Sequence, residues 1–205
     1  MNKLRHGILT VLTLIALSSA ACGQRGSDDV DWLIDVLEIK PGSVVADIGA
    51  GDGDQALEIA RHIGAEGHIY STELGRSSVE ELRRAVEEAS ADNITVIEGD
   101  ARQTNLPQEC CDAIYMRRVY HHFGDPAAMN ASLLQSLKPG GRLAVIDFEP
   151  RGTEAAPGGR SSGSQHGVTR ATVVEELSQA GFALISSEDG PGRDFYVVMR
   201  KPAKN

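Results

Sequence analysis

The hydrophobic pattern of the chain alternates between short continuous apolar runs and stretches with helical spacing. The run at 43–48 is β-branched and almost wholly apolar, which is typical of a strand buried on both faces. Over 54–63 the apolar residues recur with the spacing of a helix that covers a core. The alternation continues with strands predicted at 67–72, 94–98, 112–116 and 142–148 and helices at 27–37, 77–90 and 126–137.

After residue 148 the pattern changes. Residues 149–167 are rich in Gly, Ser, Pro and Arg without apolar periodicity, which predicts a long functional or mobile loop at the carboxyl edge of the sheet. A helix at 169–180 and strands at 182–186 and 194–199 follow, and the short turn at 190–192 predicts a closing hairpin. Together these elements predict an α/β fold with a doubly wound, mostly parallel sheet of seven strands, a C-terminal antiparallel hairpin strand, and helices on both faces.

The first 22 residues predict a targeting segment. Lys3 and Arg5 precede an apolar run at 8–17 and the small residues before Cys22. The pattern resembles a bacterial lipoprotein signal, which implies removal of residues 1–21, a lipid anchor at Cys22 and an envelope location. Ser19 stands where such signals usually carry Leu, so plain cleavage after Ala20 stays open, as does a buried helix of a cytoplasmic protein.

The length and composition favour a single domain, which we place at 22–205. The chain has 205 residues, 41% of them hydrophobic, which suffices for one core. Its net charge of −9 argues against nucleic acid or an anionic membrane surface as the main partner. Three cysteines are too few for a disulfide framework or a four-ligand zinc site. For Cys110 and Cys111 we favour two small buried thiols over a disulfide between neighbours.

The loop after the first strand, Gly49-Ala50-Gly51-Asp52-Gly53, predicts a ligand site. Its third glycine comes one position too early for the dinucleotide pattern G-x-G-x-x-G, which argues against a nicotinamide-dependent reductase. Asp47 and Asp52 would also repel a pyrophosphate. The loop therefore favours a ligand that lacks phosphates or carries positive charge.

From Asp47 to Gly53 the sequence resembles the first motif of the class I S-adenosylmethionine-dependent methyltransferases, and the run 138–146 resembles a later loop and strand of the same family. The resemblance implies a Rossmann-like fold with S-adenosylmethionine as cofactor. It implies that Asp47 receives the amino-acid end of the cofactor, that Glu73 accepts from two ribose hydroxyls, and that Asp100 accepts from the adenine amine. The remaining implied contacts are the loop residues Gly49, Ala50, Gly51 and Gly53, and the backbone N–H of Ala101.

His121 and His122 follow the fourth strand, beside the predicted methyl group, and are the candidate catalytic residues. Either imidazole could take a proton from the acceptor, or both could shape the pocket and cap the next helix. We expect no metal, because neighbouring residues do not easily share one ion and the sequence shows no third ligand. Arg117 and Arg118 could contact an anionic group or lie at the surface.

These observations favour a methyltransferase that acts on a small-molecule acceptor. The arginines and histidine in and around the long loop fit either a polar or anionic acceptor or the composition of a flexible linker; they are Arg151, Arg160, His166 and Arg170. The alternative is an exported, non-catalytic binding module that keeps the fold. The argument for this alternative is that S-adenosylmethionine is made in the cytoplasm, whereas the N-terminus predicts export.

Overall fold

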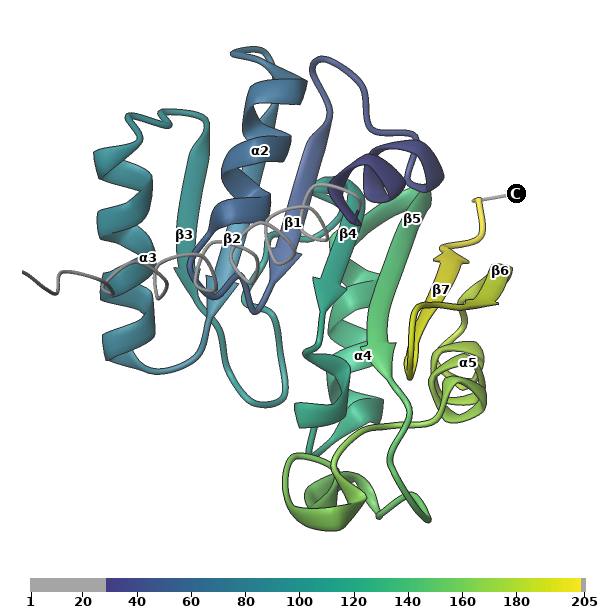
Figure 1. The fold of residues 1–205 in the computed structure, drawn as a ribbon. Helices are drawn as coiled ribbons and strands as arrows, with labels where there is room; N and C mark the ends of the chain where they lie inside the picture. Colours follow the sequence, from purple (N-terminus) through teal and green to yellow (C-terminus); the bar gives the residue numbers. More distant parts are fainter. Residues whose placement is uncertain (1–28, 204–205) are drawn as a thin grey trace, which may run out of the picture.

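The computed structural model describes residues 29–203, and within that range seven strands form one sheet with helices on both faces (Figure 1). The strand order is β3-β2-β1-β4-β5-β7-β6, and among the described strands β7 alone runs opposite in direction to the other six. The predicted fold class is confirmed. The strands are β1 (Val44–Ile48), β2 (His68–Glu73), β3 (Ile94–Glu98), β4 (Cys111–Arg117), β5 (Leu137–Phe148), β6 (Ala183–Asp189) and β7 (Asp194–Arg200).

The helices divide between the two faces of the sheet. A helix at 29–36 and α2 (Asp54–Ile63) pack on one face, where α3 (Arg76–Glu88) contributes Val86 to the same core. The opposite face is covered by α4 (Pro126–Ser136) and α5 (Arg170–Gln179). Because both faces are covered, the central strands are buried and are apolar at most positions on both sides. Three short 3₁₀ turns complete the fold: η1 (Tyr120–His122), η2 (Pro157–Gly159) and η3 (Gly163–Gln165).

Local sequence explains where α4 and α5 begin. Asp125 and Thr169 precede them, and each side chain accepts a hydrogen bond from a backbone N–H of the first turn, at 3.1 and 3.2 Å. Pro126 follows at the first helical position, where its missing N–H costs no bond. The predicted start of the fifth strand at Arg142 is late, because Leu137 already pairs with Cys111 across the sheet.

Cys110 and Cys111 are joined by a disulfide bond. The expectation of two thiols is therefore wrong, and the alternative, a disulfide between neighbours, describes the structure. Both residues lie at the start of β4, on the edge of the sheet opposite to the glycine loop.

The predictions for the first 22 residues lie outside the described range. Within residues 29–203 no helix combines the length and apolarity required to span a bilayer.

Candidate functional site

The carboxyl ends of β1 to β4 meet at one edge of the sheet and surround a cavity of about 520 Å³. That volume suits a cofactor-sized ligand. The cavity is lined by five of the residues predicted from sequence, which come from separate segments of the chain: Gly49, Glu73, Asp100, Ala101 and His122. The other predicted residues, Asp47, Ala50, Gly51, Gly53 and His121, lie in the same segments without lining it.

The glycine loop is folded back onto the end of β2. The Gly49 N–H donates to the Thr72 carbonyl at 2.9 Å, which brings the loop backbone against the neighbouring strand. Gly49 has a φ of +71°, and a Cβ added there would lie 2.5 Å from a Val119 side-chain carbon. Only glycine fits at this position, so the sequence motif has a steric cause.

Glu73 connects the glycine loop to the cavity. Its Oε1 accepts from the Gly51 N–H and its Oε2 from the Leu74 N–H, both at 2.8 Å. Each carboxylate oxygen has a second lone pair, so both oxygens can still accept from a pair of hydroxyls. The residue is held by two backbone donors with its carboxylate at the cavity, which fits the predicted ribose contact.

Asp47 is buried beneath the loop at 3% exposure. Burial raises the pKa of its carboxyl to about 7; the Tyr115 hydroxyl opposes this shift, and the Glu73 and Asp52 carboxylates reinforce it. Tyr115 is its register neighbour on β4. Near pH 7 the Asp47 carboxyl is therefore partly protonated, and a nearby cation would favour its ionised form.

Asp100 and Ala101 line the cavity in a turn after β3. Asp100 Oδ1 accepts from the Arg102 N–H at 2.9 Å, and the Asp100 N–H donates to the Gln103 carbonyl at 3.1 Å. These two bonds fix the turn and leave Oδ2 available as an acceptor.

The two catalytic candidates occupy different environments in η1. His122 lines the cavity, and its pKa is lowered by partial burial and then by the neighbouring His121, which favours the neutral imidazole. His121 is buried at 2% exposure, with Nδ1 2.8 Å from Asp147 Oδ1. The other Asp147 oxygen accepts from the His121 backbone N–H at 3.1 Å. His122 therefore borders the cavity, whereas His121 lies behind His122 and is held in place by Asp147.

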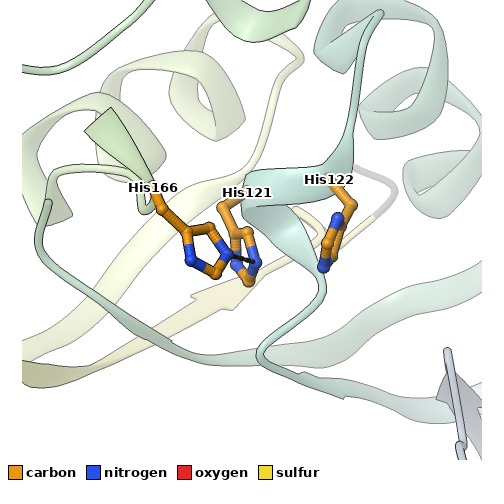
Figure 2. Close-up of side chains that lie close together, drawn as sticks. All are labelled: His121, His122 and His166. Carbon is orange, nitrogen blue, oxygen red and sulfur yellow. Dashed lines mark hydrogen bonds between the residues drawn. The ribbon is translucent and has the colours of Figure 1, made fainter. Parts of the chain in front are cut away.

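A third histidine, His166, joins this pair from the loop after β5 (Figure 2). Its Nε2 lies 3.1 Å from His121 Nε2, and the nitrogens of His121, His122 and His166 lie within 4.8 Å of one another. The premise of our expectation that no metal binds, the lack of a third ligand, is therefore wrong. No local pattern predicts this contact, because it joins residues 45 positions apart through an aperiodic loop.

Arg117 and Arg118 line the cavity but are paired with acids. Arg117 Nε lies 2.6 Å from an oxygen of Asp29, and Arg118 contacts both oxygens of Asp194 at 2.8 and 3.1 Å. Their charges are therefore largely compensated within the protein.

The loop arginines are also engaged in ion pairs. Arg160 is buried at 4% exposure and contacts Glu154 and Glu176, each at 2.9 Å. Arg170 pairs with Asp189 at 2.8 Å. Arg160 therefore anchors the loop rather than presenting charge to a ligand, which weakens the sequence argument for an anionic acceptor.

Residues 45–141 match the methyltransferase domain family. The match covers a little less than half of the chain and supports the predicted methyltransferase class. The match agrees with S-adenosylmethionine as the predicted cofactor.

The curated relatives of this domain are named for different methyl acceptors. The chain is 34% identical over 116 residues to a protein-L-isoaspartate O-methyltransferase from Methanothermobacter thermautotrophicus, covering 57% of this chain and 51% of that protein. It is 28% identical over 118 residues to a ubiquinone/menaquinone biosynthesis C-methyltransferase from Vibrio vulnificus, covering 57% and 45%. The chain therefore spans about half the length of the curated relatives it matches.

The methyltransferase fold extends beyond the matched domain. An S-adenosylmethionine-dependent methyltransferase of known structure from Aquifex aeolicus superimposes with a TM-score of 0.73 at 21% identity, over 84% of this chain and 89% of that one. The loop that carries His166 lies outside residues 45–141. The segment that brings His166 to η1 is thus not covered by the family match.

Proposed function

We propose that this chain is a class I S-adenosylmethionine-dependent methyltransferase that acts on a small molecule. The observation that carries the proposal is the single cavity where the glycine loop, the acids after β2 and β3 and His122 meet. The net charge of −9 disfavours a nucleic acid acceptor.

The cofactor contacts follow from the positions of the acids. Glu73 accepts from the ribose hydroxyls, Asp100 accepts from the adenine amine and Ala101 donates its N–H to the ring. Asp47 compensates the ammonium group of the cofactor from beneath the loop, directly or through water. The loop backbone, with Gly49, Ala50, Gly51 and Gly53, lets the ligand approach closely.

Methyl transfer from a sulfonium mainly needs alignment of donor and acceptor and the exclusion of water. His122 lines the cavity as a neutral imidazole, so its free ring nitrogen can take the acceptor's proton as the new bond to carbon forms. His121 does not line the cavity, and we assign it the role of holding this turn through Asp147.

We further propose that the chain is exported and anchored by a lipid at Cys22, on the strength of the charged, apolar and small-residue segments at 1–22. The alternative is a cytoplasmic protein. The intact mass of the protein from membrane fractions decides between them, since a soluble chain that retains residue 1 contradicts export.

Replacing Glu73 with Ala should weaken S-adenosylmethionine binding by at least about 100-fold, because two hydrogen bonds to a charged acceptor are lost. The matched control is Glu98→Ala, since Glu98 stands opposite Glu73 in the sheet, is exposed and does not line the cavity. Calorimetric titration measures both affinities. Equal affinities in the two variants would remove the ribose assignment, and cofactor binding without turnover on any acceptor screened would favour the non-catalytic module.

A further inference from the structure

We propose that His121, His122 and His166 form a binding site for one divalent transition-metal ion of the zinc type. The ligand atoms are three imidazole nitrogens, two from η1 and one from the loop between β5 and α5 (Figure 2). Neutral imidazole is a preferred ligand of Zn²⁺ and its neighbours in the first transition row.

The distances are close to those of a tetrahedral site. Zinc–nitrogen bonds of about 2.0–2.1 Å place two tetrahedral ligands roughly 3.3 Å apart. The Nε2 atoms of His121 and His166 lie 3.1 Å apart, and the nitrogens of all three residues lie within 4.8 Å. The rings of His121 and His122 lie side by side, with centroids 4.1 Å apart. Since His122 is exposed, a modest rotation of its side chain brings its nitrogen into range.

His121 is already oriented as a metal ligand. Asp147 is fully buried, and its Oδ1 lies 2.8 Å from His121 Nδ1. A buried carboxylate favours a proton on Nδ1, which leaves the lone pair of Nε2 directed toward His166. A carboxylate behind a ligating histidine is the usual outer contact of a zinc site. Asp147 also accepts from the backbone N–H groups of His121 and Phe148, so its own position is fixed.

The backbone that carries His166 is also fixed. The Gly167 N–H donates to the Arg160 carbonyl at 2.9 Å, and the Val168 N–H donates to the Phe148 carbonyl at 3.1 Å. Gly167 has a φ of +127°, and a Cβ there would lie 2.7 Å from the Phe148 carbonyl oxygen. The His166 ring then packs edge-on against Phe148, with centroids 5.1 Å apart. His166 is thus held beside η1 by close backbone packing.

Three protein ligands leave a fourth position open, as in catalytic zinc sites. His122 lines the cofactor cavity, and Ser161 from the same loop as His166 lines it too. The open position therefore lies beside the space proposed for the acceptor. Resting on the proposed function, we assign the ion the task of binding an oxygen or sulfur atom of the acceptor. A metal-bound hydroxyl or thiol loses its proton more readily, so with the ion bound, water replaces His122 as the proton acceptor. The freed lone pair then bonds to the methyl carbon while the carbon–sulfonium bond breaks and its electron pair passes to sulfur, leaving S-adenosylhomocysteine.

Without a metal, the same geometry is a hydrogen bond between the Nε2 atoms of His121 and His166. A metal site would bind an added ion in a fixed ratio to the chain, whereas a simple hydrogen-bonded pair of histidines would not. The test is to treat the full chain with a chelator, remove the chelator and titrate the protein with Co²⁺, whose visible absorption reports tetrahedral coordination, and with Zn²⁺ by calorimetry. We expect one ion per chain.

The variants His122→Ala and His166→Ala should each weaken Zn²⁺ binding by at least about 100-fold, and Asp147→Asn by about 10- to 100-fold. His68→Ala is the matched control, because His68 begins β2 at the opposite edge of the sheet, and it should leave the affinity unchanged. Circular dichroism checks that each variant folds. Affinity unchanged in His166→Ala, or no stoichiometric binding by the wild-type chain, overturns the metal site. S-adenosylmethionine binding by the chelator-treated chain is measured separately, so failure of this site is distinguishable from failure of the proposed function.

Discussion

Replacing Asp47 with Asn should stabilise the chain at pH 8 in the absence of cofactor. The folded protein raises the pKa of this buried carboxyl from 3.8 to about 7. Between these values the folded state binds more protons than the unfolded state, so stability falls as pH rises through this window. A shift of this size costs at most roughly 4 kcal/mol above the window. Denaturant unfolding should show that Asp47→Asn is more stable than wild type at pH 8 and that the two differ least near pH 4.

The matched control is Asp52→Asn in the same loop. Asp52 is exposed and contributes only a minor part of the Asp47 shift, so its replacement should change stability slightly at every pH. If Asp47→Asn leaves the slope of stability against pH as it is in the wild type, the account of Asp47 fails. If the account holds, the protein carries an acid that costs it stability, which is the mark of a residue retained for binding.

Replacing Arg160 with Met should destabilise the chain by about 3–5 kcal/mol, because removing the cation leaves partly buried carboxylates without a partner. Arg160 lies between Glu154 and Glu176 at 4% exposure, and Glu176 also accepts from the Tyr120 hydroxyl. Thermal unfolding measures the loss. Adding Glu176→Gln to Arg160→Met should recover part of the loss, since it removes one of the unpaired charges.

Arg170→Met is the control for the Arg160 prediction. Arg170 pairs with Asp189, whose side chain is 89% exposed, and an ion pair in water contributes about 0–1 kcal/mol. Equal destabilisation by the two arginine variants would contradict the view that Arg160 anchors the loop. A large loss in Arg160→Met alone would show that the buried ion pairs of Arg160 stabilise the fold, as expected of an anchor for the loop that carries His166.

The elements near the cofactor cavity could be predicted because their signals are local. The bounds of α2 match the predicted helix at 54–63. At Gly49 a larger residue would collide with the side chain of Val119, so this position of the motif has a local steric cause. The fifth strand is longer than predicted at its start, because its extension depends on pairing with Cys111 rather than on its own residues. Adjacent cysteines carry no local signal that separates thiols from a disulfide, so that choice was wrong.

The contacts of the loop between β5 and α5 could not be predicted, since they link distant segments. His166 and Arg160 lie in a loop without periodicity, and their partners are found on η1, in that loop and on α5. Asp147 is the exception, because an acid within the apolar run at 142–148 is itself a signal for a buried polar contact. The interpretation of the loop arginines as contacts for an anionic acceptor is also weakened, because Arg160 and Arg170 pair with acids. These pairings could not be recognised from the sequence.

The central claim is tested most directly by calorimetric titration of the purified wild-type chain with S-adenosylmethionine, S-adenosylhomocysteine and NAD. The account predicts micromolar binding of the two sulfur ligands, one molecule per chain, and no binding of NAD, because the acids around the glycine loop disfavour a pyrophosphate. A folded chain that binds neither sulfur ligand, or that prefers NAD, would contradict it.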